Sequence, residues 1–115
     1  MNNIIYHNPN WSKSRKSVEI LKDKGIDFEI IHYIKSPPSI NELKSICKKL
    51  NLKASQIIRR GERDFKENNL SKVLDDETAL LNKMIQFPKI IERPIIIIGE
   101  KAVIGRPPEN ILDIL

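Results

Sequence analysis

Cysteine is almost absent from the sequence, since Cys47 is the only one among 115 residues. A single cysteine excludes an internal disulfide framework, a Cys-x-x-Cys dithiol and a cysteine-rich zinc site. Histidine and acidic residues are not clustered with it, so we expect no metal site and no bound cofactor.

Long hydrophobic runs are also missing. The longest, Ile95–Ile98, is far too short to span a bilayer, and the first residues lack the basic region and long apolar run of a signal peptide. We therefore expect a cytoplasmic protein without a membrane partner. With 40% hydrophobic and 30% charged residues, the composition is that of an ordinary globule. The length predicts one domain over residues 1–115.

Aromatic residues make up only 5% of the chain. The 20 basic and 15 acidic residues give a formal charge of +5, but the basic residues are spread along the chain and are not interleaved with aromatic ones. Lysine, isoleucine and asparagine are abundant together, as AT-rich codons produce. We therefore do not expect nucleic acid to be a partner.

The first third of the chain predicts a strand, a helix and a second strand. Residues 3–7 form a short apolar run, and Ser12 is placed to cap a helix that Gly25 closes. Residues 28–34 are rich in strand-forming types.

The middle of the chain is predicted to be helical. Ser39 and Glu42 form a capping box of the S-x-x-E kind, which opens a helix to about residue 50. Residues 54–59 suggest a short helix, and the acidic run 75–77 suits the start of another because the helix dipole favours acid there.

A β-hairpin and a closing helix are predicted at the end. Pro94 opens the strand of four isoleucines, Gly99-Glu100 forms a two-residue turn, residues 101–104 return, and residues 109–115 form the last helix. This order predicts the α/β class with a thioredoxin-like layout, in which helices flank a mixed four-stranded sheet that carries a helical insertion. The isoleucine run suits a strand buried on both faces.

The loop between the first strand and the first helix is one candidate site. A strand end that runs into a helix N-terminus gathers backbone N–H donors, which can hold an anion or stabilise a thiolate. Every β-α unit has such a loop, so the pattern alone is weak. The candidate residues are His7, Asn8, Ser12, Ser14 and Arg15.

Arginines at three structural boundaries form a second candidate set. Arg59 ends the predicted short helix, Arg93 precedes a proline, and Arg106 precedes another. A guanidinium suits the planar, forked recognition of an oxyanion. The alternative is three unrelated solvated arginines.

Several spaced motifs together resemble one family. The segments IYHNP at 5–9 and SKSR at 12–15 resemble the active-site loop of the glutaredoxin-coupled arsenate reductases. ERPI at 92–95 and IGRPP at 104–108 resemble that family's later motifs, and Tyr33 fits its pattern as well. The motifs agree in order and distance over essentially the whole chain.

The resemblance implies a thioredoxin-like fold with an oxyanion site. In that family a cysteine of the first loop attacks arsenate, and glutathione and glutaredoxin then reduce the adduct to arsenite. Three arginines hold the oxyanion, and by motif they correspond here to Arg59, Arg93 and Arg106. The family also suggests a cis peptide bond between Arg93 and Pro94, which proline makes inexpensive.

The chain departs from the family at the nucleophile. The family's cysteine falls at position 11, which is Trp11 here, and an indole cannot form the arsenate adduct. Ser12 is not redox-active, and Cys47 lies on the apolar face of a predicted helix, where we expect a small hydrophobe. We interpret His7 as a loop residue that orders its neighbours rather than as a general base, and His32 as a packing or surface residue.

The loss of the thiolate changes the expected electrostatics. If three arginines share one pocket, neighbouring cations repel each other by ~1–4 kcal/mol. The pocket should then recruit a carboxylate or a solution anion such as arsenate, phosphate or sulfate. Trp11 either offers its face to a guanidinium, which is worth ~0.5–2 kcal/mol, or plugs the pocket.

Two functions remain open from the sequence. The first is a non-catalytic module, a pseudoenzyme that binds an oxyanion, glutaredoxin or another protein. The second is an arsenate reductase that converts arsenate to arsenite by a route without a thiol at position 11, with glutathione as co-substrate. The first is favoured because the known covalent route needs a thiol.

Overall fold

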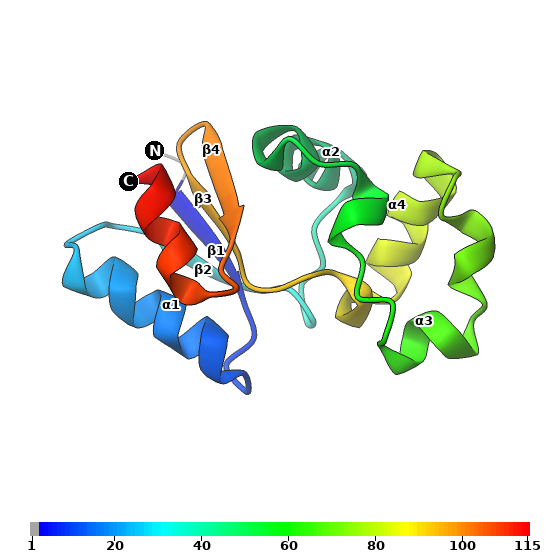
Figure 1. Cartoon of the computed structure of the whole chain (residues 1–115), viewed down its shortest axis with the longest axis horizontal. Coiled ribbons are helices and arrows are strands. Elements are labelled where there is room, and N and C mark those ends of the chain that lie inside the picture. Colours follow the sequence, from blue (N-terminus) through cyan, green and yellow to red (C-terminus); the bar gives the residue numbers. More distant parts are fainter. Residues whose placement is uncertain (1–2) are drawn as a thin grey trace. The chain divides into compact units, whose positions relative to one another are not determined.

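The computed structural model describes residues 3–115, whose contacts group into two compact units. The sheet unit comprises the described residues up to Ser36 together with Arg93–Leu115, and the helical unit is Pro37–Glu92. Figure 1 draws both. The single domain expected over residues 1–115 stays a prediction.

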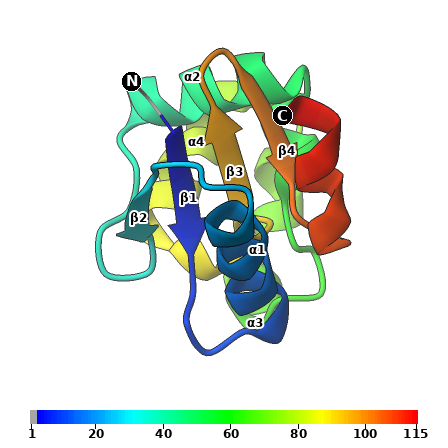
Figure 2. The ribbon, with the colours of Figure 1, turned by 90° about the vertical axis from the view of Figure 1, so that its left-hand side faces the viewer.

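The sheet unit contains a mixed four-stranded sheet. Its strands are β1 (Asn3–His7), β2 (Glu29–His32), β3 (Ile95–Ile98) and β4 (Lys101–Ile104). They lie side by side in the order β2-β1-β3-β4 (Figure 2). β1 pairs in parallel with β2 and antiparallel with β3, which pairs antiparallel with β4. The predicted α/β class is confirmed.

Two helices pack on one face of this sheet. They are α1 (Ser12–Asp23), seen in front of the strands in Figure 2, and the 3₁₀ helix η4 (Pro108–Ile114). Gly25 has a φ of +67° just beyond α1, as expected for a residue that closes a helix. The core beneath the two helices is fully buried and consists of Ile5, Leu21, Ile96 and Ile111.

The isoleucine strand is buried at its first three residues, and Ile98 at its end is half-buried. Ile95, Ile96 and Ile97 are each at most 4% exposed. Successive side chains of a strand point to opposite faces, so both faces of β3 are covered. This confirms the interpretation of the run as a strand buried on both sides.

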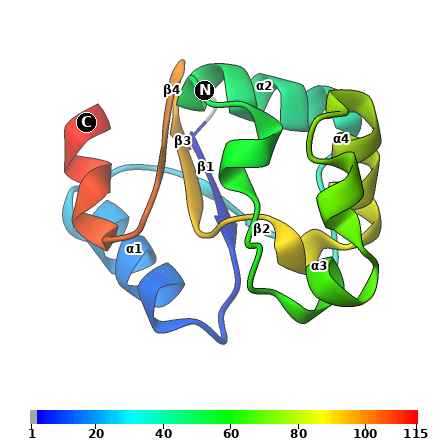
Figure 3. The same cartoon turned by 45° about the vertical axis from the view of Figure 1, so that its right-hand side comes forward.

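The helical unit consists of three α-helices and three 3₁₀ helices. In chain order they are α2 (Ile40–Leu50), η1 (Ala54–Ile57), α3 (Arg63–Glu67), η2 (Leu70–Val73), α4 (Glu77–Gln86) and η3 (Pro88–Ile90). Figure 3 shows α2, α3 and α4. The predicted capping box is confirmed: the Glu42 amide donates to Ser39 Oγ at 3.1 Å, and the Ser39 amide donates to Glu42 Oε1 at 3.0 Å.

The start of α1 differs from the prediction. Trp11, not Ser12, is the N-cap, with extended backbone angles (φ −111°, ψ 127°), and no side chain caps the helix. The helix begins one residue early because the Arg15 amide already reaches the Trp11 carbonyl, at 3.1 Å. The prediction that Ser12 caps this helix is therefore wrong.

The segment around Arg59 also differs. The short helix ends at Ile57, the next residue, Ile58, is in extended backbone, and Arg59 follows it outside the helix. The Arg59 amide donates to the Ile90 carbonyl at 2.7 Å, and the Glu92 amide donates to the Ile57 carbonyl at 2.8 Å. This two-sided pairing pulls the residues after Ile57 out of the helix, so Arg59 does not end a helix as predicted.

The last helix is of a different type from the one expected. We predicted a helix over residues 109–115, and the chain forms the 3₁₀ helix η4 over Pro108–Ile114 instead. Its Ile111 faces the sheet core, which is the part of the prediction that matters for packing.

Candidate functional site

The loop between β1 and α1 is held by hydrogen bonds of its own residues. Asn8 makes most of them: its carbonyl accepts from the Trp11 amide at 3.0 Å, and its Oδ1 accepts from the Asn10 amide at 3.1 Å. Such a turn fixes the backbone conformation of the loop. The loop therefore has a defined backbone conformation where it leads into α1.

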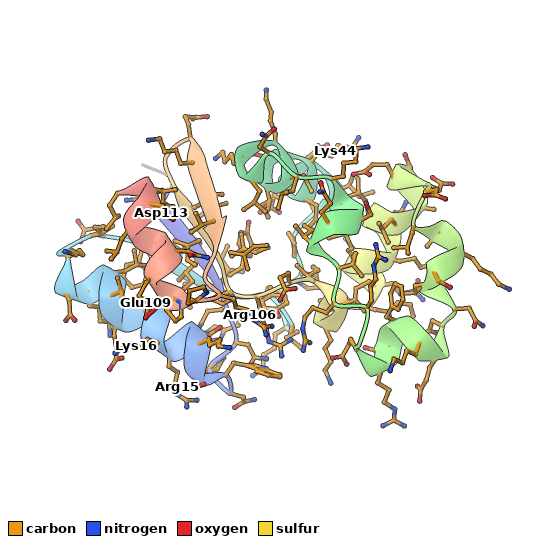
Figure 4. All side chains as sticks on the ribbon, viewed as in Figure 1. Arg15, Lys16, Lys44, Arg106, Glu109 and Asp113 are labelled. Carbon is orange, nitrogen blue, oxygen red and sulfur yellow. The ribbon has the colours of Figure 1, made fainter. Side chains whose placement is uncertain are left out.

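Two helix residues fasten the same loop from the other side. Ser14, fully buried, accepts from the Asn8 amide at 3.4 Å. Arg15 donates from Nη1 to the Pro9 carbonyl at 2.9 Å. Figure 4 shows Arg15 at the start of α1. Of the predicted loop residues, Asn8, Ser14 and Arg15 thus have structural roles, while Ser12 is exposed and caps nothing.

Trp11 and Arg93 are brought together, although 82 positions separate them in the sequence (93 − 11). The guanidinium carbon of Arg93 lies over the Trp11 ring, 3.2 Å from its centroid. Arg93 is only 4% exposed, whereas 44% of Trp11 is exposed. The indole therefore supports a buried cation from one side while remaining open to solvent.

A backbone contact joins the segments that carry Arg93 and Arg106. The Gly105 amide donates to the Pro94 carbonyl at 2.8 Å, and each arginine is the neighbour of one bonded residue. Both X-Pro bonds here, Arg93-Pro94 and Arg106-Pro107, are cis, and the first is the one the resemblance suggested. Figure 4 shows Arg106 where the chain leaves β4.

Glycine is required at position 105 by close packing. A Cβ there would lie 2.8 Å from Ser17 Oγ, 2.9 Å from Ile96 Cδ1 and 2.9 Å from Pro94 Cγ. These contacts come from α1, β3 and the segment after Arg93. A larger residue would push them apart and move the two arginine segments.

Arg59 belongs to the helical unit and has a carboxylate partner there. Its Nη1 donates to Glu62 Oε2 at 3.0 Å and to the Lys89 carbonyl at 3.3 Å. Both side chains of the ion pair are 19% exposed. Glu62 was not among the residues predicted from the sequence, although the Arg-x-x-Glu spacing is a usable signal for such a pair.

His7 is a buried histidine at the end of β1. Burial comes first among the causes that lower its pKa below 6.5, followed by the positive charges of His32 and Arg15. The His7 and His32 rings lie 5.8 Å apart across the parallel strands. Among the described residues, His7 Nδ1 has no hydrogen-bond partner. His32 was interpreted as a packing or surface residue, and its exposure supports the second of these.

Cys47 lies in the helical unit, on the buried face of α2. Burial, helped by the negative charge of Glu77, raises the pKa of its thiol to about 11. It is therefore protonated at neutral pH and is a poor nucleophile. Within residues 3–115, no three His, Cys, Asp or Glu side chains group together as metal ligands.

Sheet topology and site together define a class: a thioredoxin-like α/β protein with an arginine-bearing loop region at one end of β1 and β3. Within the described chain, none of the helices has the length and apolar character needed to cross a membrane. The chain belongs to the ArsC family, whose model matches residues 6–114.

Individual relatives agree over nearly the whole chain. An arsenate reductase of Haemophilus influenzae is 43% identical over 116 aligned positions that cover all of both chains. YfgD, an uncharacterized protein of Escherichia coli, is 39% identical over 96% of this chain and 94% of its own. The solved structure of an arsenate reductase from Vibrio cholerae superposes with a TM-score of 0.93 at 40% identity, covering 100% of this chain and 98% of the other.

Proposed function

We propose that this protein is a non-catalytic member of the arsenate reductase family that binds an oxyanion through arginines, with Trp11 in the place of the nucleophilic cysteine. Arg93 and Arg106 supply the contacts in the sheet unit, and Arg59 supplies its own contact in the helical unit. The ligand class is tetrahedral oxyanions such as arsenate, phosphate or sulfate.

The observation that carries the proposal is the stack of the Arg93 guanidinium on the Trp11 ring, at 3.2 Å. A cation–π contact uses the flat face of a guanidinium, whereas oxyanions are recognised through its N–H edge. The two contacts are compatible. The stack therefore supports Trp11 as a wall of the anion site, meaning a residue that lines it. It argues against the alternative in which Trp11 covers the N–H edge of Arg93 and plugs the pocket.

Loss of the reaction follows from the same residue. In the covalent route a thiolate displaces an oxygen of arsenate. The indole of Trp11 has no thiolate and cannot take this role. Cys47 does not replace it, because its thiol has a pKa of about 11 and sits in α2 of the helical unit. The module would then act by binding an oxyanion or a protein such as glutaredoxin.

A second function is favoured by the relatives, because the 43% identical Haemophilus influenzae protein is described as an arsenate reductase. In this alternative, glutathione attacks the bound arsenate directly. Two glutathione thiols lose one electron and one proton each and form a disulfide, while arsenic(V) becomes arsenic(III) and one arsenate oxygen leaves as water with the two protons. Glutathione is then a co-substrate, and Trp11 only lines the site.

The test is arsenate-dependent NADPH oxidation coupled through glutathione, glutaredoxin and glutathione reductase. The wild-type chain, Trp11→Cys and Cys47→Ala are assayed side by side. We expect turnover only from Trp11→Cys, because the substitution restores a thiol beside Arg93. Wild-type turnover that survives Cys47→Ala would instead establish the glutathione route.

Binding is measured separately by titration calorimetry with sodium arsenate. The proposal expects binding without turnover in the wild-type chain, and weaker binding in Arg93→Gln. Trp11→Phe serves as the matched control, because it keeps an aromatic face under the guanidinium without adding a thiol. Absence of binding together with absence of turnover would contradict the proposed ligand class.

A further inference from the structure

We propose that Glu62 selects the oxyanion at Arg59, favouring anions that keep a hydroxyl proton over anions that have none. The inference rests on the proposed function, since it assigns selectivity to one arginine of that function. Phosphate and arsenate belong to the favoured class, and sulfate belongs to the disfavoured one.

The geometry fixes a carboxylate beside the arginine. Glu62 Oε2 lies 3.0 Å from Arg59 Nη1. The same Nη1 donates to the Lys89 carbonyl at 3.3 Å, which restrains the guanidinium from a second side. With 19% of each side chain exposed, the pair is mostly shielded from water.

The Glu62 side chain is directed to Arg59 although its backbone begins a helix. Glu62 is the N-cap of α3, where a side chain commonly accepts a helix amide, but it makes no such bond. The Phe65 amide bonds to the Glu62 carbonyl instead, at 3.1 Å. A change of the carboxylate group therefore leaves the backbone start of α3 intact.

The chemistry of the carboxylate then discriminates between ligands. An ionised carboxylate accepts hydrogen bonds and donates none. Near neutral pH, phosphate and arsenate carry at least one O–H, which can donate to Glu62 while other oxygens bind Arg59. Sulfate carries no proton, so its oxygens would face the carboxylate lone pairs. Repulsion of the wrong ligand is a general source of specificity.

The experiment compares inorganic phosphate with sulfate by titration calorimetry at pH 7 and constant ionic strength. We expect the wild-type chain to prefer phosphate by about 10- to 100-fold, the effect of one hydrogen bond to a charged group. In Glu62→Gln the amide can donate, so sulfate affinity should rise and the preference should shrink to a few-fold. Glu62→Asp should keep part of the preference because it keeps the charge.

The matched control is Glu67→Gln in the same short helix. Glu67 also pairs with an arginine, Arg63, at 2.8 Å, but that pair is 57–81% exposed. Its removal should leave the phosphate preference unchanged. Circular dichroism checks that every variant is folded.

Failure of this inference can be distinguished from failure of the proposed function. If the wild-type chain and Glu62→Gln bind both anions with the same ratio, Glu62 is not a selector, and the proposed function stands. A wild-type chain that binds sulfate as tightly as phosphate overturns the inference without any variant. If no folded form binds either anion, the proposed function itself is overturned.

Discussion

The sheet unit and the helical unit hold their candidate arginines in opposite ways. In the sheet unit, Arg93 is buried against the face of Trp11. In the helical unit, Arg59 is paired with the carboxylate of Glu62. An aromatic face stabilises a cation without adding a negative charge, whereas a carboxylate balances the cation and occupies its N–H donors.

The difference shows that arginines matched by the same family pattern need not bind an anion in the same way. Arg93 is presented with its edge unaffected by the stack, while at least one nitrogen of Arg59 already donates to two acceptors. An anion would meet a guanidinium stacked on Trp11 at Arg93 and a guanidinium paired with Glu62 at Arg59.

The largest expected effect is the coupling energy of the two arginine contacts. A double-mutant cycle with Trp11→Ala and Arg93→Gln should give about 2 kcal/mol, since one partner is buried. The cycle with Arg59→Gln and Glu62→Gln should give about 1 kcal/mol, because the pair is partly exposed. Urea unfolding of the single and double variants measures both.

Salt separates the two contacts further. The coupling between Arg59 and Glu62 should fall when sodium chloride is raised, because the two opposite charges are screened. The coupling between Trp11 and Arg93 should change less, since the Trp11 ring carries no net charge for salt to screen. A cycle that gives zero for Trp11 and Arg93 would remove the main support for Trp11 as a wall.

Helix capping provides a second contrast, with smaller expected effects. The helical unit uses side-chain caps: Ser39 accepts from the Glu42 amide, and Asp76 accepts from the Ala79 amide at 3.1 Å. Replacing Ser39 or Asp76 by alanine should each lower the free energy of unfolding by about 1 kcal/mol. In the sheet unit, Ser12→Ala should change it by less than about 0.5 kcal/mol, as for other surface substitutions.

Chemical unfolding of the three alanine variants measures these values against the wild-type chain. A loss of a full kcal/mol in Ser12→Ala would mean that Ser12 does cap α1 in solution. Equal and small losses in all three would mean that the side-chain caps of the helical unit contribute little.

The same contrast explains what could be predicted from the sequence. Capping by Ser39 and Glu42 depends on residues three positions apart, so the local pattern was sufficient. The strand of isoleucines was likewise recognisable from its own composition. The α/β order followed from these local signals and from the short connections between them.

Predictions failed where distant residues decide the local structure. Ser12 loses the cap position because the Arg15 amide bonds to the Trp11 carbonyl, and the ring of Trp11 contacts Arg93 far along the sequence. Arg59 leaves its predicted helix because residues 90–92 bond to its segment. The candidate arginines could be named from motifs, and Trp11 could be named as a face for a guanidinium. That the guanidinium belongs to Arg93 could not be predicted, and Glu62 was missed although its i, i+3 spacing from Arg59 was a usable signal.

The smallest predicted effect is a pH dependence that belongs to the sheet unit. Both histidines of the sequence, His7 and His32, lie there. The pKa of His7 is lowered in the folded chain, chiefly by burial. When the pH falls below 6.5, the unfolded chain therefore binds a proton that the folded chain resists. The free energy of unfolding should be fully retained above that pH and should decline below it.

Urea unfolding at a series of pH values between about 5 and 8 covers this window around the ordinary histidine pKa. His7→Gln should flatten the decline, because the buried titrating group is gone. His32→Gln should reduce it less, since it removes one positive neighbour of His7 and leaves the burial in place. Amide hydrogen exchange compares the two units. The helical unit has no histidine, so the free energy of its local opening should not fall over this pH range. If the free energy of unfolding of His7→Gln declined with falling pH as steeply as that of the wild-type chain, other groups would cause the decline. The burial of His7 at the end of β1 would then not control it.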